Sequence, residues 1–88
     1  MLNLVVSNKF KKDLELKRKQ NKDLSKIKEV LEIIRQGKII KKKYKDHQLK
    51  GDMKDYRELH VEPDWLLVYK VDGDTLFLIR TGSHSELF

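Results

Sequence analysis

The spacing of the apolar residues changes along this chain from a helical period to a strand period, and that change limits the folds it can adopt. In the segment 24–36 the apolar residues recur in steps of three and four, which places them on one face of a helix. They are Leu24, Ile27, Leu31 and Ile34. The segments 65–71 ("WLLVYKV") and 75–81 ("TLFLIRT") instead form the short apolar runs typical of buried strands. Helices in the first half therefore combine with a sheet in the second half.

Shorter signals set the order of the other elements. Alternating apolar residues over 2–6 predict a first strand, and Ser7 is a suitable N-cap for a helix over 8–20. The pair Asp72 and Gly73 predicts a hairpin between the last two strands, because glycine tolerates the positive φ of such turns.

These elements predict a single α+β domain over residues 1–88 with the order β-α-α-β-β-β. Two N-terminal helices pack on one face of a small, mainly antiparallel sheet, and the opposite face stays open. Alternation in the strand near residue 60 directs Leu59 and Val61 toward the helices. The same alternation directs Tyr56 and His60 toward the open face.

Composition excludes several classes of protein. The chain has no cysteine, which excludes disulfides, a thiolate nucleophile and Cys-based zinc sites. No apolar run approaches the ~20 residues that span a bilayer, and the start lacks the features of a signal peptide. We therefore expect a cytoplasmic protein that does not contact the membrane.

The net charge of +6 is divided unevenly along the chain. Residues 1–57 carry 18 Lys/Arg against 8 Asp/Glu, giving +10, whereas residues 58–88 carry 2 against 6, giving −4. A basic field of this kind favours polyanions such as nucleic acid or an acidic protein segment, although it also serves solubility alone.

The lysine-rich segment 38–54 has no usable periodicity and is predicted to be an exposed connection. Four of its lysines form a candidate phosphate-contacting patch, with a solvated loop as the alternative: Lys41, Lys42, Lys43 and Lys45.

Three histidines and one aspartate stand outside every apolar periodicity. His60 faces the open side of the sheet, and Asp64, just beyond the turn, is near enough to orient its ring. His47 lies in the exposed connection, and His84 lies in a closing segment whose last two apolar residues can dock back on the domain. We expect the three rings to meet at one end of the sheet. The alternative is that each is an ordinary surface or structural side chain.

No metal or other cofactor is expected at these residues. The histidine spacings of 13 and 24 residues match no compact ligand motif. The chain also lacks a serine-nucleophile elbow, a P-loop and a dinucleotide-binding fingerprint.

Imidazoles, a carboxylate and cations suit the cleavage of RNA by its own 2′-hydroxyl, which needs a base, an acid and positive charge near the phosphate. The cations that could supply that charge, or else form salt bridges, are Lys50, Arg57 and Arg80. The aromatic side chains on which a base could stack are Tyr56, Trp65 and Phe88. For Trp65 a place in the core fits equally well.

The second half of the chain resembles the YafQ-type toxins of the RelE superfamily, which are the toxin halves of bacterial type II toxin–antitoxin pairs. The resemblance covers roughly residues 44–88 and rests on three motifs in order: "D-H-x-L-K-G", "H-x-x-P-D-W" and "G-S-H-S-x-L-F". The first half agrees in length and in its strand-helix-helix layout.

This resemblance implies a RelE-like fold and a metal-independent, ribosome-dependent mRNA endonuclease. It implies as partners mRNA, the ribosome and a cognate antitoxin, with operator DNA contacted only through the antitoxin. The positions that match the catalytic set of the family are His47, His60, Asp64, His84 and Phe88. Two alternatives stay open: a non-catalytic basic module that binds RNA or the ribosome, and a toxin of the same fold with a different target.

Overall fold

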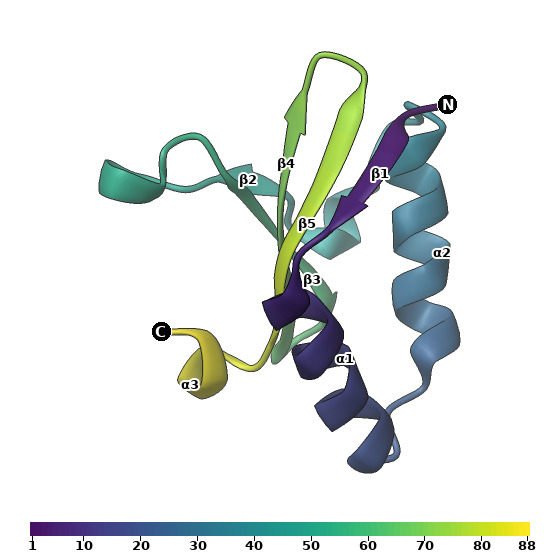
Figure 1. The fold of residues 1–88 in the computed structure, drawn as a ribbon, viewed down its shortest axis with the longest axis vertical. Coiled ribbons are helices and arrows are strands. Elements are labelled where there is room, and N and C mark those ends of the chain that lie inside the picture. The colour runs from purple at the N-terminus through teal and green to yellow at the C-terminus, as the bar shows by residue number, and fades with distance from the viewer.

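The computed structural model describes all 88 residues and contains five strands and three α-helices (Figure 1). The elements in chain order are β1 (Asn3–Val6), α1 (Asn8–Lys19), α2 (Leu24–Arg35), β2 (His47–Gln48), β3 (Arg57–Glu62), β4 (Trp65–Asp72), β5 (Thr75–Gly82) and α3 (His84–Leu87). Two single 3-10 turns flank β2, at Lys42–Tyr44 and Gly51–Met53.

The two long helices begin at the capping residues of the sequence. The Ser7 hydroxyl accepts a hydrogen bond from the Phe10 amide at 3.0 Å, and the Asp23 carboxylate accepts one from the Ser25 amide at 3.0 Å. Each cap satisfies one of the free N–H groups of the first helical turn. The predicted helices are therefore confirmed to within a residue or two. None of the helices combines the length and the apolar character needed to cross a membrane.

The strands form one sheet in the order β1-β5-β4-β3-β2. The edge strand β1 pairs in parallel with β5, and the other three pairs are antiparallel. The predicted hairpin joins β4 to β5, with Gly73 at φ +60°. The expectation of a mainly antiparallel sheet is confirmed.

The main core lies between α1, α2 and one face of the sheet. Phe10 from α1 and Ile27 from α2 pack with Leu59 and Leu67 of the sheet, and all four are at most 2% exposed. Val61 packs against the same cluster, so the alternation predicted for β3 is confirmed. Burying each large apolar side chain contributes roughly 1.5–3 kcal/mol.

The segment 38–54 is more ordered than its sequence predicts. Tyr44 is 6% exposed and belongs to the core, and the two residues of β2 extend the sheet beside β3. Asp46 accepts hydrogen bonds from Arg57 and from the Tyr69 hydroxyl. The expectation of a simple exposed connection is wrong, because single anchoring side chains hold this segment and single anchors leave no periodic signal.

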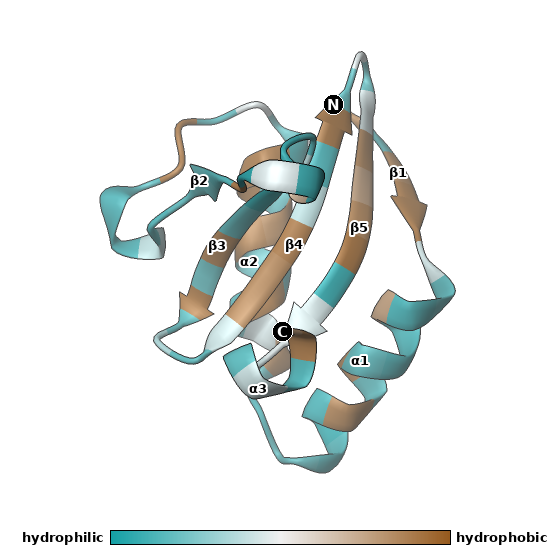
Figure 2. Cartoon of the chain, turned by 90° about the vertical axis from the view of Figure 1, so that its left-hand side faces the viewer, coloured by the Kyte–Doolittle hydropathy of each residue, from teal (hydrophilic) through white to brown (hydrophobic).

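The opposite face of the sheet is only partly open. Leu66 and Val68 of that face are at most 2% exposed. The short helix α3 lies on this side, away from α2 (Figure 2). A Cβ at Gly82 would lie 3.0 Å from Glu86 Oε1 and 3.2 Å from Leu87 Cδ2, so the glycine allows α3 to approach β5 closely. The prediction of a wholly open face is corrected accordingly.

Candidate active site

His84 is held at the first turn of α3, directly after β5. The Ser83 hydroxyl accepts from the Glu86 amide at 3.2 Å, and Glu86 Oε1 accepts from the Ser83 amide at 2.7 Å, which together form a capping box. The closing segment is therefore an ordered helix, and its cap determines where the His84 backbone lies.

Asp64, in the turn between β3 and β4, contacts His84 twice. Its Oδ1 accepts from the His84 amide at 3.0 Å and from His84 Nδ1 at 2.9 Å. The main-chain N–H of His84, followed by its ring, lowers the pKa of the Asp64 carboxyl from its ordinary value. The sequence-based expectation that Asp64 orients His60 is wrong, because α3 brings His84 over the turn that carries Asp64.

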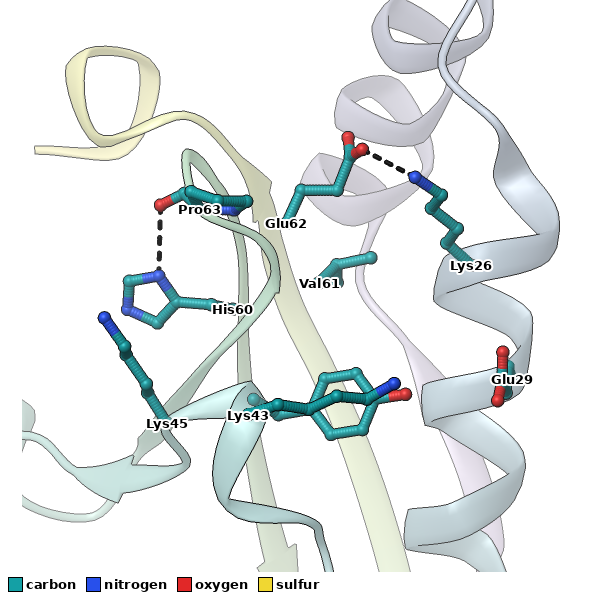
Figure 3. Close-up of a pocket in the computed structure, with 9 residues that line it drawn as sticks. Lys26, Glu29, Lys43, Lys45, His60, Val61, Glu62 and Pro63 are labelled. Atoms are coloured by element: carbon teal, nitrogen blue, oxygen red, sulfur yellow. Dashed lines mark hydrogen bonds and ion pairs between the residues drawn. The ribbon is translucent and has the colours of Figure 1, made fainter.

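His60 lies beside His84 and is oriented by a different group. Its Nδ1 is 3.1 Å from the Pro63 carbonyl oxygen (Figure 3). The ring centroids of His60 and His84 are 5.9 Å apart, with the planes tilted by 56°. His60 is partly exposed and His84 is exposed. Of the three rings that were expected to meet, those of His60 and His84 are confirmed to lie together in solvent-accessible space.

His47, on the edge strand β2, contacts a residue that sequence reasoning missed. Its Nδ1 is 2.7 Å from the Lys45 carbonyl oxygen, and its Nε2 is 3.6 Å from Glu58 Oε1. The Glu58 side chain is only 8% exposed and lies on the same face of β3 as His60, two residues away. Because residues two apart in a strand point to the same face, the position of Glu58 relative to His60 was the sequence feature that could have identified it.

All three imidazoles direct Nδ1 at an oxygen that can only accept a hydrogen bond. The acceptors are a carboxylate for His84 and main-chain carbonyls for His60 and His47. Each Nδ1 therefore carries a proton, and Nε2 of His60 and of His84 is the nitrogen left for proton exchange with a substrate. At His47 this nitrogen faces the carboxylate of Glu58.

A cleft of about 380 Å³ opens beside His60 (Figure 3). Lys45 extends toward the imidazole of His60, and Lys43 lies over the Tyr44 ring at 5.1 Å. On the far side, Lys26 and Glu62 form an ion pair of 2.8 Å. Cations thus border the cleft on the side of the predicted lysine patch.

Five lysines were predicted to contact RNA, and all of them are exposed: Lys41, Lys42, Lys43, Lys45 and Lys50. Among them, Lys43 and Lys45 line the cleft beside His60. An RNA contact for these lysines stays a prediction.

Both predicted arginines are engaged with carboxylates. Arg57 Nη2 lies 2.8 Å from Asp46 Oδ2, and Arg80 Nε lies 2.6 Å from Asp13 Oδ2. The hydrogen bond to its carboxylate raises the pKa of each guanidinium. Of the two alternatives for these arginines, the structure contains the salt bridge, and an RNA contact stays a prediction.

The three predicted stacking residues have different surroundings. Trp65 is fully buried and its indole N–H donates to Thr81 Oγ1 at 2.8 Å, so the predicted stacking role is wrong because neither face of the ring is free. Tyr56 is partly exposed beside Lys70. Phe88 is 65% exposed and lines a cleft of about 350 Å³ with Val68.

No group of three or more His, Cys, Asp or Glu side chains is placed to hold a metal ion. The Nδ1 atoms of the three histidines are already engaged with oxygen acceptors. Metal independence itself stays a prediction for a chelation experiment.

The arrangement is suited to proton transfer on a substrate that lies between two imidazoles. Each ring is oriented through Nδ1 and presents Nε2, and lysines border the cleft beside His60. A base and an acid a few ångströms apart can serve the two ends of a phosphodiester displacement.

Known proteins share this chain's sequence and fold. A family model described as "Bacterial toxin of type II toxin-antitoxin system, YafQ" matches residues 2–88. The "mRNA interferase toxin YafQ" of Escherichia coli strain K12 is 41% identical over 83 residues, which are 93% of this chain and 90% of that protein.

Solved structures agree over the whole chain. A copper-bound mutant toxin from Helicobacter pylori is 42% identical, covers 100% of both chains and has a TM-score of 0.96. YafQ in the E. coli DinJ-YafQ complex is 39% identical, covers 100% of this chain and 99% of its own, and has a TM-score of 0.92. The predicted family and fold class are confirmed. The chain belongs to the YafQ family of toxins of bacterial type II toxin–antitoxin systems.

Proposed function

We propose that this toxin is an endoribonuclease that cleaves mRNA by attack of the 2′-hydroxyl on the adjacent phosphate. The observation that carries the proposal is the pair His60 and His84, whose ring centroids are 5.9 Å apart and whose Nδ1 atoms are both engaged. Relatives of this chain are named mRNA interferases, which supports the same activity.

The proposed reaction needs two proton transfers. One imidazole accepts the 2′-hydroxyl proton at Nε2, and the 2′-oxygen then forms a bond to phosphorus. The bond from phosphorus to the 5′-oxygen breaks, and the other imidazole, protonated, gives its Nε2 proton to that oxygen. The products are a 2′,3′-cyclic phosphate and a free 5′-hydroxyl. Asp64 Oδ1 accepts the hydrogen bond from His84 Nδ1 and so orients the ring with Nε2 free, whichever of the two transfers His84 performs.

Groups around the two imidazoles supply charge and surface for the RNA strand. Lys43 and Lys45 beside the cleft can stabilise the negative charge that develops on the phosphate oxygens. Phe88, with its largely exposed ring beside an apolar slot, can stack on a nucleobase. His47, paired through Nε2 with Glu58, fits an assisting role better than a direct proton transfer.

We further propose that the substrate is mRNA on the ribosome in the cytoplasm, and that a cognate antitoxin neutralises the toxin. The DinJ-YafQ complex of a relative supports an antitoxin partner. The +10 charge of residues 1–57 suits an acidic, disordered partner segment that folds on binding. Contact with operator DNA is expected only through that antitoxin.

Primer extension on translated mRNA tests the proposal. Wild-type protein should cut in the presence of EDTA and leave a 2′,3′-cyclic phosphate or the 3′-phosphate formed from it. His84→Ala should cut at least about a hundredfold more slowly, because one proton transfer loses its catalyst. A His84→Ala protein that cuts as fast as wild type would contradict the assignment. If Lys43→Ala abolished growth arrest while the histidine variants remained toxic, the result would favour a non-catalytic binding module.

A further inference from the structure

We propose that an ion pair between Lys17 and Glu86 is a positioning device for His84. Lys17 lies on α1 and Glu86 on α3, 69 residues apart in the chain, and Lys17 Nζ is 2.7 Å from Glu86 Oε1. Lys17 follows Phe10 by seven residues in α1, so the helical period places it on the same face as that buried side chain. The inference concerns the geometry of the site and rests on the proposed function only for its effect on cleavage.

Lys17 is buried to an unusual degree for a lysine. Its side chain is 4% exposed, whereas lysines are almost never fully buried unless they are paired. The ammonium group has two acceptors, Glu86 Oε1 and Gln20 Oε1 at 2.9 Å. Gln20 in turn donates to Glu86 Oε2 at 3.3 Å. The end of α1 therefore holds both carboxylate oxygens of Glu86.

Glu86 connects this contact to the backbone that carries His84. Its Oε1 accepts from the Ser83 amide at 2.7 Å and thereby closes the capping box of α3. The Lys17 ammonium, followed by the Ser83 amide, lowers the pKa of Glu86 to about 2. The carboxylate is thus charged throughout the pH range in which the histidines can act.

The short helix α3 needs such external support. It has four residues, and a helix of one turn has no stability of its own in water. Its position is set by three contacts with the rest of the domain: the Lys17 pair, the Asp64 bonds to His84, and the packing of Leu87 against Gly82. Lys17, Asp64, Ser83 and Glu86 line one shallow hollow, so the first two contacts act at the same place.

Loss of the ion pair should shift α3 and with it the ring of His84. Catalysis is sensitive to such shifts, because a misplacement of about 1 Å can reduce a rate by roughly a hundredfold. We therefore expect Lys17→Met and Glu86→Gln to cleave mRNA about 10- to 100-fold more slowly at saturating substrate. The half-saturating substrate concentration should change little, because neither residue borders the cleft at His60.

Three comparisons separate positioning from general stability. Glu86→Gln keeps an oxygen for the Ser83 amide and removes only the charge, so Glu86→Ala should be the more severe change. Arg18→Met is the matched control, because Arg18 pairs with Glu15 on the exposed side of the same helix and should leave cleavage unchanged. The double variant Lys17→Met/Glu86→Gln should be no slower than the slower single variant, since both remove one contact.

The imidazole NMR signals of the three histidines give a readout that does not depend on activity. In Lys17→Met the signals of His84 should shift, while those of His47, which is held by Lys45 and Glu58, should stay. Unchanged His84 signals and wild-type cleavage in a folded Lys17→Met protein would overturn the proposal. If wild type fails to cleave RNA, the proposed function fails, and the NMR comparison still decides whether the pair positions His84.

Discussion

Replacing Asp64 by Asn tests which histidine this carboxylate serves. The Asn side chain keeps an oxygen that can accept from the His84 amide, which preserves the position of α3. It replaces a charged acceptor for His84 Nδ1 by a neutral one, which weakens the hydrogen bond that orients the ring. The change should therefore slow cleavage through His84 alone.

The size of the effect follows from the geometry and the exposure of the pair. A positioned acid or base contributes about 10²- to 10⁴-fold to a rate, and Asp64 supports only one of the two imidazoles. The Asp64 and His84 side chains are 69% and 57% exposed, so solvent screens their interaction. We expect cleavage of ribosome-bound mRNA to slow by roughly tenfold, and by at most about a hundredfold.

A double-mutant cycle makes the test specific. In the His60→Ala background, Asp64→Asn should reduce the single-turnover cleavage rate by the same factor as in wild type. In the His84→Ala background it should leave the rate almost unchanged, because a group that acts through His84 has no effect without it. An equal loss in the His84→Ala background would refute the pairing described above. In that case Asp64 would act on the substrate or on His60.

Three further predictions concern the core, the α1–α3 contact and the cleft. Thr81→Val leaves a buried indole N–H without its acceptor, so it should destabilise the fold by about 2 kcal/mol and lower the melting temperature by roughly 8–16 °C, whereas cleavage by the folded protein should not change. The folded-state pKa of Glu86, about 2, lies below its ordinary value of 4.5, so the stability it contributes is present above pH 4.5 and is lost as the pH falls from 4.5 toward 2. Urea unfolding across that range should show this loss in wild type and much less of it in Lys17→Met. Lys45→Ala should reduce the cleavage rate at limiting mRNA concentration by about tenfold. Lys38→Ala removes the same charge outside the cleft and should have little effect on that rate.

The helices, the hairpin and the two-residue period of β3 could be predicted because their causes are local. Ser7 and Asp23 cap helices through amides two or three residues away. Gly73 permits the positive φ of one turn. Leu59 faces the helices because successive side chains of a strand point to opposite faces. Each of these effects depends on residues that are close together in the sequence, so it can be predicted from neighbouring positions.

The candidate site could be predicted as a set of residues but not as a set of contacts. The motifs around His47, His60 and His84 identified the imidazoles, yet the partner of Asp64 was predicted incorrectly. His84 is 20 residues from Asp64, and their contact depends on where β5 ends and how α3 packs on it. Asp64 is near His60 in the sequence, but the fold places it in contact with His84.

The sequence by itself determined the class of fold, the family and the identity of the imidazoles, because apolar period, capping residues and short motifs act through neighbouring positions. Only the tertiary structure decided that Trp65 is enclosed in the core, that Glu58 lies against His47, and that Lys17 reaches Glu86. Those contacts join residues 11 to 69 positions apart. These contacts stabilise the protein only after the sheet has brought the segments together and excluded water between them. No local sequence pattern can therefore predict them.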